Sequence, residues 1–228
     1  MPVQEAAARR APERGAGSRE EILRVATEEF AEKGLAGARV DEIAARTRTS
    51  KRMIYYYFGS KEALYVACLE EAYARIRALE NALRLDHLPP VPALVRMVEH
   101  TFDYHVQHPD FVRLVMNENL ERGRYIARSE RIRGLNVSVI ENLRRILERG
   151  AAEGVFRPGV DPLQLHATIS ALCFHVVGNR HTFGTIFGFD PCAPENLARR
   201  RREVVRTVLA AVLTPAAAAA TEPAGHGA

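Results

Sequence analysis

The sequence is poor in cysteine, and none of its cysteines is paired in a metal-binding or redox motif. Cys68, Cys173 and Cys192 lie far apart, form no CxxC motif and are odd in number. This usage is typical of reduced, mostly buried thiols in a cytosolic protein and not of a disulfide framework. With 47% apolar residues, the chain has enough material for a core. We therefore expect a cytoplasmic protein stabilised by that core.

Long apolar runs are also missing. No stretch approaches the roughly 20 residues that a helix needs to span a bilayer, so we expect no membrane as a partner. The charged start, MPVQEAAARRAPERGAGSREE, is followed by no apolar segment like that of a secretory signal. No clear alternation of apolar and polar residues indicates β-strands. Ala, Leu, Arg and Glu dominate instead, and they predict an all-α fold.

Catalytic motifs are absent as well. The chain has no GxSxG elbow, no P-loop, no GxGxxG and no HExxH. We therefore expect no enzyme activity and no cofactor. His105 and His108, with His100 nearby, have a spacing that allows two metal ligands, but the sequence specifies no third one. Solvated or helix-end histidines are the simpler interpretation, and we expect no metal.

Apolar periodicity divides the chain into about nine helices. Residues 1–18 and 215–228 lack such periodicity and are predicted to be a flexible arm and a disordered tail. Between them we predict a helix-turn-helix domain over 19–62 and a larger helical domain over 63–214. Helices are expected at about 18–34, 40–47, 50–58, 60–83, 91–107, 110–122, 128–152, 162–181 and 194–213. A loop containing Gly and Pro is predicted over 182–193.

The second and third predicted helices are short, are joined by a tight turn and follow a bracing helix. This geometry presents one helix to the major groove of DNA. From Ile43 to Lys61 the chain has five basic residues and no Asp or Glu. Such a cationic patch favours a polyanionic partner. The sequence therefore predicts that the string SKRMIYYYFGSK, residues 50–61, contacts double-stranded DNA.

Helical spacing assigns the residues of this string to two faces. Ile54 and Phe58 are four residues apart and are expected to face the core. Lysine and arginine bind guanine edges or phosphates, and tyrosine hydroxyls bind phosphate oxygens. The alternative is that the aromatic residues are core and the basic residues a solvated face, but three aromatics cannot all point inward. The candidate DNA-contacting residues are Arg48, Lys51, Arg52, Met53, Tyr55, Tyr56, Tyr57 and Lys61.

The stretch GLAGARVDEIAARTRTSKRMIYYYFGSKEALYVACL, residues 34–69, resembles the N-terminal domain of the TetR (tetracycline-repressor) family. The family pattern Leu/Ile-Tyr-x-Tyr/His-Phe-x-x-Lys-x-x-Leu is matched by Ile54, Tyr55, Tyr57, Phe58, Lys61 and Leu64. The resemblance implies an Ω-shaped homodimer of nine or ten helices per chain, whose larger domain binds an inducer. It also implies phosphate contacts for Tyr55, Tyr57 and Lys61, base contacts for Lys51 and Arg52, and a further contact for Tyr56.

Two positions depart from the family pattern. Arg39 stands where the second helix usually has a capping Ser or Thr, and the turn reads Thr47-Arg48-Thr49 in place of Ala-Gly-Val. A residue other than glycine can occupy a left-handed turn position only at some energetic cost. We therefore expect a changed angle at Arg48 and an added phosphate contact from its side chain.

The larger domain resembles, in the stretch HPDFVRLVMNENLERG…YIARSERIR, a C-terminal domain found with this module in regulators of aromatic and heterocyclic catabolism. A small-molecule effector of that kind is therefore expected. Pockets are mostly apolar with a few polar groups, and core packing is the alternative for each polar or aromatic candidate. The candidate ligand residues are His100, Tyr104, Met116, Asn117, Asn136, Phe174 and His175.

Two apolar stripes in the last two predicted helices suggest a homodimer. In the family the corresponding helices form a four-helix interface, and the alternative is a core within one chain. The predicted interface residues are Leu165, Ile169, Leu172 and Val176 on one helix and Leu197, Val204, Val208 and Val212 on the other. The chain is thus expected to be a DNA-binding regulator, a repressor released from a near-palindromic operator by a small molecule. The rival is a helical ligand carrier with a vestigial helix-turn-helix, against which the basic face argues.

Overall fold

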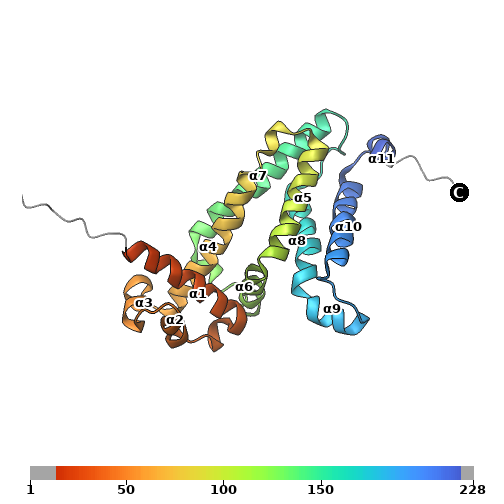
Figure 1. Ribbon diagram of the computed structural model, residues 1–228. Coiled ribbons are helices and arrows are strands. Elements are labelled where there is room, and N and C mark those ends of the chain that lie inside the picture. Colours follow the sequence, from red (N-terminus) through yellow and green to blue (C-terminus); the bar gives the residue numbers. More distant parts are fainter. Residues whose placement is uncertain (1–13, 222–228) are drawn as a thin grey trace, which may run out of the picture. The chain divides into compact units, whose positions relative to one another are not determined.

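The computed structural model describes residues 14–221 of the chain, with side chains for residues 19–220. These residues form eleven α-helices and two short 3-10 turns (Figure 1). The one β-bridge found among them is an isolated one between Phe156 and Leu213. Within this part of the chain, no helix has the length and apolar character needed to cross a bilayer. The predicted all-α fold is confirmed.

The chain divides into two compact units between Cys68 and Leu69. The first unit contains α1 (Arg14–Gly37), α2 (Val40–Arg46), α3 (Lys51–Phe58) and the beginning of α4 (Lys61–Asn81). The sequence placed the boundary six residues earlier, after residue 62. The difference arises because the first two turns of α4 fill the core of this unit with Leu64, Tyr65 and Cys68, which are all fully buried.

The core of the first unit follows from the predicted helical spacing. Ile22, Ala26 and Phe30 of α1 are fully buried, as are Ile43 of α2 and Ile54 of α3. The rings of Phe30 and Tyr65 meet edge to face, with centroids 5.1 Å apart, an arrangement that aromatic pairs favour. This small core braces α2 and α3, and so positions the helix-turn-helix.

The second unit is a bundle built around α5 (Pro90–Gln107), which packs against α6 (Pro109–Leu120), α7 (Glu130–Ala152), α8 (Pro162–Gly178) and α10 (Pro194–Val212). Two short turns, η1 (Leu85–His87) and η2 (Ile126–Arg128), precede α5 and α7. Ser129 caps α7 by accepting the N–H of Ile132 at 3.1 Å, and Asp161 caps α8 by accepting the N–H of Leu163 at 2.7 Å. These caps fix where the two helices begin.

The predicted loop over 182–193 is wrong in its first half. Residues Arg180–Phe187 form the helix α9, and α8 ends at Gly178, before the predicted residue 181. Gly184 was taken as a helix breaker, but it sits inside α9 for a packing reason. A Cβ atom there would lie 2.8 Å from the carbonyl oxygen of Phe189. Glycine has no Cβ atom and therefore avoids this clash.

Both predicted ends of the chain also need correction. Helix α1 begins at Arg14, inside the predicted arm, while residues 1–13 lie outside the described residues. The predicted tail begins with a helix, α11 (Pro215–Thr221), and residues 222–228 lie outside the described part. Ala217 and Ala218 of α11 pack against the main core, and Thr214 accepts the N–H of Ala217 at 3.3 Å. Alanine side chains thus hold this segment against the core, although its sequence shows no apolar periodicity.

The structure predicts opposite effects for two glycines of α7. Gly150 is buried, and a Cβ atom there would collide with the ring of Phe156. Gly150→Ala should therefore lower the free energy of unfolding by about 1–3 kcal/mol, as overpacking does. Gly134 has open space around its Cα, so Gly134→Ala should raise this free energy by up to about 1 kcal/mol. Thermal or urea unfolding measures both; a Gly150→Ala protein as stable as the wild type would contradict this packing.

Candidate functional site

Helix α3 presents one polar and aromatic face to solvent. Its N-terminus is capped by Ser50, whose hydroxyl accepts the N–H of Met53 at 3.2 Å. Ile54 is fully buried and anchors the helix. Tyr56 is 78% exposed, and Met53 and Tyr55 are each 38% exposed. Lys51 and Arg52 are exposed at the leading end. The face expected from helical spacing is therefore the face that the structure exposes.

Two aromatic residues at the end of α3 are only half-buried. Phe58 was expected in the core, but it lies at its edge, with the guanidinium carbon of Arg19 5.3 Å from the ring centroid. The ring of Tyr57 meets Tyr56 and Phe58 edge to face, at 5.6 and 6.3 Å. The aromatic run thus forms a continuous surface strip and leaves the core mainly to Ile54.

The basic residues of this region differ in their partners. Lys51 Nζ lies 3.0 Å from a carboxylate oxygen of Asp41 on α2, and Arg46 pairs with Glu28 on α1. Arg48 and Arg52 have no ion-pair partner among the described residues. Arg52 and Arg48 can therefore meet an external anion without breaking an ion pair that the structure describes, whereas Lys51 must leave Asp41 to do so.

Arg48 occupies the left-handed region, with φ 50°, as the departure from the family pattern predicted. The structure shows how the start of α2 is stabilised without a capping side chain at Arg39, which the sequence did not reveal. Arg39 makes no side-chain cap, but its backbone N–H donates to the buried carboxylate of Glu29 at 3.3 Å. Burial opposes ionisation of Glu29, yet hydrogen bonds from Lys33 and from this N–H hold its pKa below the usual value.

The start of α4 completes this surface. Ser60 caps the helix by accepting the N–H of Ala63 at 3.0 Å. Lys61 is half-buried, with its Nζ 3.5 Å from the carbonyl oxygen of Ala36. This distance is at the limit of a hydrogen bond, so the ammonium group remains available to a stronger acceptor.

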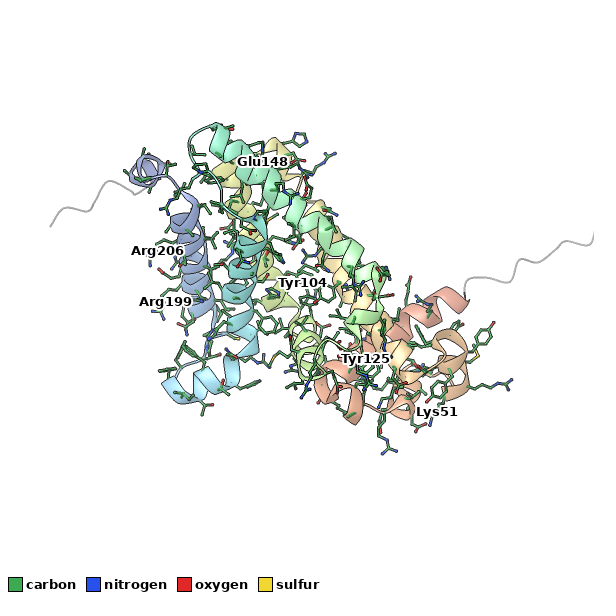
Figure 2. All side chains as sticks on the ribbon, turned by 180° about the vertical axis from the view of Figure 1, so that it is seen from behind. Lys51, Tyr104, Tyr125, Glu148, Arg199 and Arg206 are labelled. Atoms are coloured by element: carbon green, nitrogen blue, oxygen red, sulfur yellow. The ribbon has the colours of Figure 1, made fainter. Side chains whose placement is uncertain are left out.

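The second unit contains an aromatic and polar cluster centred on Tyr104 of α5. Tyr104 is buried, and Figure 2 shows it in the interior of the helical bundle. Its ring centroid lies 4.3 Å from that of His108 and 5.7 Å from that of Phe111. His105 stacks on Phe111 at 5.7 Å and meets Phe174 of α8 at 6.1 Å. His108 is a helix-end residue as predicted, but His105 is buried and not solvated.

Charged groups of α4 belong to the same cluster. Arg77 and Glu80 are 5% and 3% exposed, and Arg77 Nη1 lies 2.8 Å from Glu80 Oε2. The charge of Arg77 acts on Tyr104, His105 and His166. Burial, and after it the charge of Arg77, lower the pKa of both histidines to about 4. These rings are therefore neutral at neutral pH.

Arg77 and Glu80 were not predicted as site residues, although their helical spacing indicated that they face the core. One helix face, by its spacing, contains Tyr73, Ile76, Arg77 and Glu80. Leu79 is 42% exposed, so the buried stripe runs through Ile76 and its charged neighbours. Charged residues at core spacing were the available indication of a buried polar site.

The predicted ligand residues do not form one group. His100, Tyr104 and Phe174 belong to the Tyr104 cluster. Met116 is 38% exposed, Asn117 is half-buried, and the amide of Asn136 donates to the carbonyl oxygen of Ile132 on its own helix at 2.8 Å.

His175 lies elsewhere, in a pocket of about 390 Å³ between α8, α9 and α10. Its ring centroid is 5.2 Å from that of Phe183. Asn179, Phe189 and Arg199 also line this pocket. It is therefore distinct from the Tyr104 cluster.

The apolar stripes predicted to meet a partner chain are mostly buried within the second unit. Six of these side chains are at most 5% exposed in the single chain, and Leu172 and Leu197 pack against the same core. The reason is that α8 and α10 turn these stripes toward α5. The predicted interface residues that instead belong to the core of the single chain are Leu165, Ile169, Leu172, Val176, Leu197, Val204, Val208 and Val212. Any interface on these helices must use their opposite faces.

Comparison with known families decides the relationship. Residues 22–68 match the model of bacterial regulatory proteins of the tetR family. Residues 90–208 match the model of a tetracyclin repressor-like C-terminal domain, which covers more than half of the chain. The chain belongs to the TetR family. It is a DNA-binding transcriptional regulator, as the face of α3 indicated.

Individual relatives agree with this assignment. The chain is 38% identical over 173 residues to the HTH-type transcriptional repressor NicS of Pseudomonas putida, covering 76% of this chain and 82% of that protein. It is 36% identical over 102 residues to the repressor SCO4008 of Streptomyces coelicolor, covering 45% of this chain and 50% of that protein. The solved structure of the regulator SCO4942 of Streptomyces coelicolor superposes with a TM-score of 0.65 at 29% identity, covering 86% and 98% of the two chains.

The left-handed turn at Arg48 gives a testable difference between two variants. Arg48→Gly removes the strain of a Cβ atom at φ 50°, whereas Arg48→Ala removes the same charge and keeps that strain. The glycine variant should be the more stable of the two by about 1 kcal/mol. Thermal unfolding of both proteins measures this difference. Equal melting temperatures would show that the turn carries no strain.

Proposed function

We propose that this TetR-family regulator is a homodimeric repressor that acts in the cytoplasm. In this proposal α3 binds a near-palindromic operator, and a small molecule in the second unit releases it. The observation that carries the proposal is the face of α3, where exposed tyrosines and two unpaired arginines adjoin a capped helix start. Relatives described as repressors support the direction of regulation.

The DNA contacts follow from where each side chain lies. Arg52 and Lys51, at the leading end of α3, are assigned to base edges in the major groove. Arg48 and Lys61 are assigned to phosphates on either side of the groove. The hydroxyls of the tyrosines bind phosphate oxygens, and Met53 contributes an apolar contact. The residues of this proposed interface are Arg48, Lys51, Arg52, Met53, Tyr55, Tyr56, Tyr57 and Lys61.

The effector is proposed to bind at the Tyr104 cluster. Helix α4 carries Lys61 at its beginning and Arg77 and Glu80 near its end, so one continuous helix is shared by the two functions. An effector weakens operator binding only if it binds better to the state in which α3 is misplaced for DNA. A coupling of about 1–3 kcal/mol would lower operator affinity about 5–150-fold.

Dimerisation is proposed through the outward faces of α8 and α10, which lie side by side (Figure 1). Ala167 and Ala171 of α8 and Thr207 and Ala210 of α10 are exposed. Small side chains let helices approach closely, and a two-fold dimer matches a near-palindromic site. A single reading helix contacts few bases, so a dimer also supplies the specificity.

Variants of the DNA-facing residues should separate phosphate contacts from base contacts. Lys61→Ala should weaken binding to all sequences and reduce the salt dependence by about one phosphate contact. Arg52→Ala should relax the preference at one base position, by about 1–3 kcal/mol if the contact is bidentate. Gel-shift or anisotropy titrations at several salt concentrations measure both effects.

The matched control for this experiment is Arg113→Ala, which removes an exposed arginine of α6 in the second unit. It should leave operator affinity unchanged. If the triple change of Lys51, Arg52 and Lys61 to alanine also leaves operator affinity unchanged, α3 is not the reading helix, and a ligand carrier becomes the better assignment.

The dimer interface is tested by charge at an exposed alanine. Ala171→Glu places two carboxylates near the proposed two-fold axis, and like charges buried together are strongly unfavourable. We expect monomers in sedimentation and a loss of operator binding, with unchanged helix content. Val137→Glu on α7, where Val137 is 65% exposed, is the control and should remain dimeric. An Ala171→Glu dimer would move the interface to another surface.

A further inference from the structure

The Tyr104 cluster contains buried polar atoms that the protein leaves without hydrogen-bond partners among the described residues. They include Arg77 Nε and Nη1, His100 Nε2 and His105 Nδ1. Arg77 Nη1 and Glu80 Oε2 form an ion pair at 2.8 Å, but neither atom has a hydrogen-bond partner among the described residues. Buried groups left unpaired cost free energy. Several such groups in one cluster indicate a site that a ligand completes.

Charges of both signs act on the cluster. Arg77, the exposed Arg75, Glu80 and Asp110 act on Tyr104, and the buried Glu118 acts on Tyr73. Of the two arginines, Arg77 is the buried one.

Arg77 keeps its charge at neutral pH. Burial raises the pKa of the Glu80 carboxyl to about 7, although Arg77 acts in the opposite direction. Glu80 therefore compensates Arg77 only in part. Asp103 of α5 does not help, because its carboxylate accepts two hydrogen bonds from Arg201 of α10, both at 3.0 Å.

The remaining groups of the cluster are neutral. Burial raises the pKa of Tyr104 to about 12, and the low pKa values of His105 and His166 leave both rings uncharged. Neutral histidine rings offer one donor and one acceptor each. The cluster thus supplies a buried cation, Arg77, together with several neutral groups able to hydrogen-bond.

Aromatic rings pack around His105 in the cluster. Tyr104, Phe111 and Phe174 surround His105 within ring-centroid distances of 6.5 Å, and Tyr73 meets Phe111 edge to face at 5.4 Å. Aromatic faces select planar, polarisable molecules. A guanidinium among such rings selects a carboxylate, to which it donates charge-assisted hydrogen bonds.

We propose that the effector is a planar aromatic or heteroaromatic monocarboxylate whose carboxylate binds Arg77 and whose ring lies beside Tyr104 and Phe174. This inference rests on the proposed function and specifies its ligand. A ring nitrogen or hydroxyl group of the ligand would meet the unpaired atoms of His100 and His105. A second negative charge is disfavoured, since Glu80 lies beside Arg77 and the other arginine that acts on Tyr104, Arg75, is exposed to solvent.

The experiment compares acids with their uncharged counterparts on the full-length protein. Benzoate and the three pyridinecarboxylates are titrated by calorimetry and thermal shift, each beside its primary amide, which has the same shape and no charge. We expect at least one acid to bind, and its amide to bind at least about tenfold more weakly, because a hydrogen bond to a charged group outweighs a neutral one. Failure of all four acids to bind, or equal binding of acid and amide, would overturn the proposal.

Variants then identify the anchor. Arg77→Met should weaken binding of the acid at least about tenfold, whereas Arg96→Met, which changes an exposed arginine of α5, should not. Glu80→Gln removes the competing carboxylate and should preserve or increase affinity for the acid. If Arg77→Met does not fold, the double variant Arg77→Met/Glu80→Met replaces the buried pair by apolar groups, a change that proteins tolerate. Unchanged acid binding in either Arg77 variant would refute the assignment.

Gel-shifts with the operator keep this inference separate from the proposed function. An acid that binds through Arg77 without releasing the operator would confirm the anion site and refute release by the effector. Release by the neutral amides, with no binding of the acids, would confirm regulation by a small molecule and refute the anion site.

Discussion

The cost of burying charge is the constraint on which both units depend. A carboxylate or guanidinium taken out of water must be paired and hydrogen-bonded, or it destabilises the fold by several kcal/mol. Glu29 meets this requirement fully, because Lys33, Arg46 and the N–H of Arg39 surround it. It thereby ties α1 to the start of α2 and replaces the missing cap. The position of α3 follows from that connection.

Arg77 and Glu80 form an ion pair, but their hydrogen bonding is incomplete. They are as buried as Glu29, yet atoms of both have no hydrogen-bond partner among the described residues. A pair that served stability alone could be exchanged for apolar residues at no loss. The incomplete hydrogen bonding of this pair within an aromatic cluster supports the proposed role in binding. The contrast between a satisfied and an unsatisfied buried charge thus separates the structural site from the candidate effector site.

Much of the fold and of the DNA-facing surface was accessible from the sequence. Ile22, Ala26 and Phe30 recur at helical spacing and form the first core. The run around Tyr55 and Tyr56 located the exposed face of α3. These features are local, since helical periodicity and capping depend on neighbours within a few residues. The effector cluster was only partly accessible. His100 and Tyr104 were recognised as polar or aromatic residues within helices, whereas Arg77 was passed over as an ordinary helix residue.

The sequence by itself determined the all-α class, the helix-turn-helix and the face of α3, because each depends on a repeating local pattern. The tertiary structure alone decided what each apolar stripe meets. Val204 and Val208 have the pattern of a dimer interface, but they are buried against the chain's own core. Periodicity shows that a face is apolar and does not show whether its neighbour is the same chain or another. Likewise, only the folded chain shows which buried charges lack partners, because hydrogen bonds between distant helices leave no trace in local spacing.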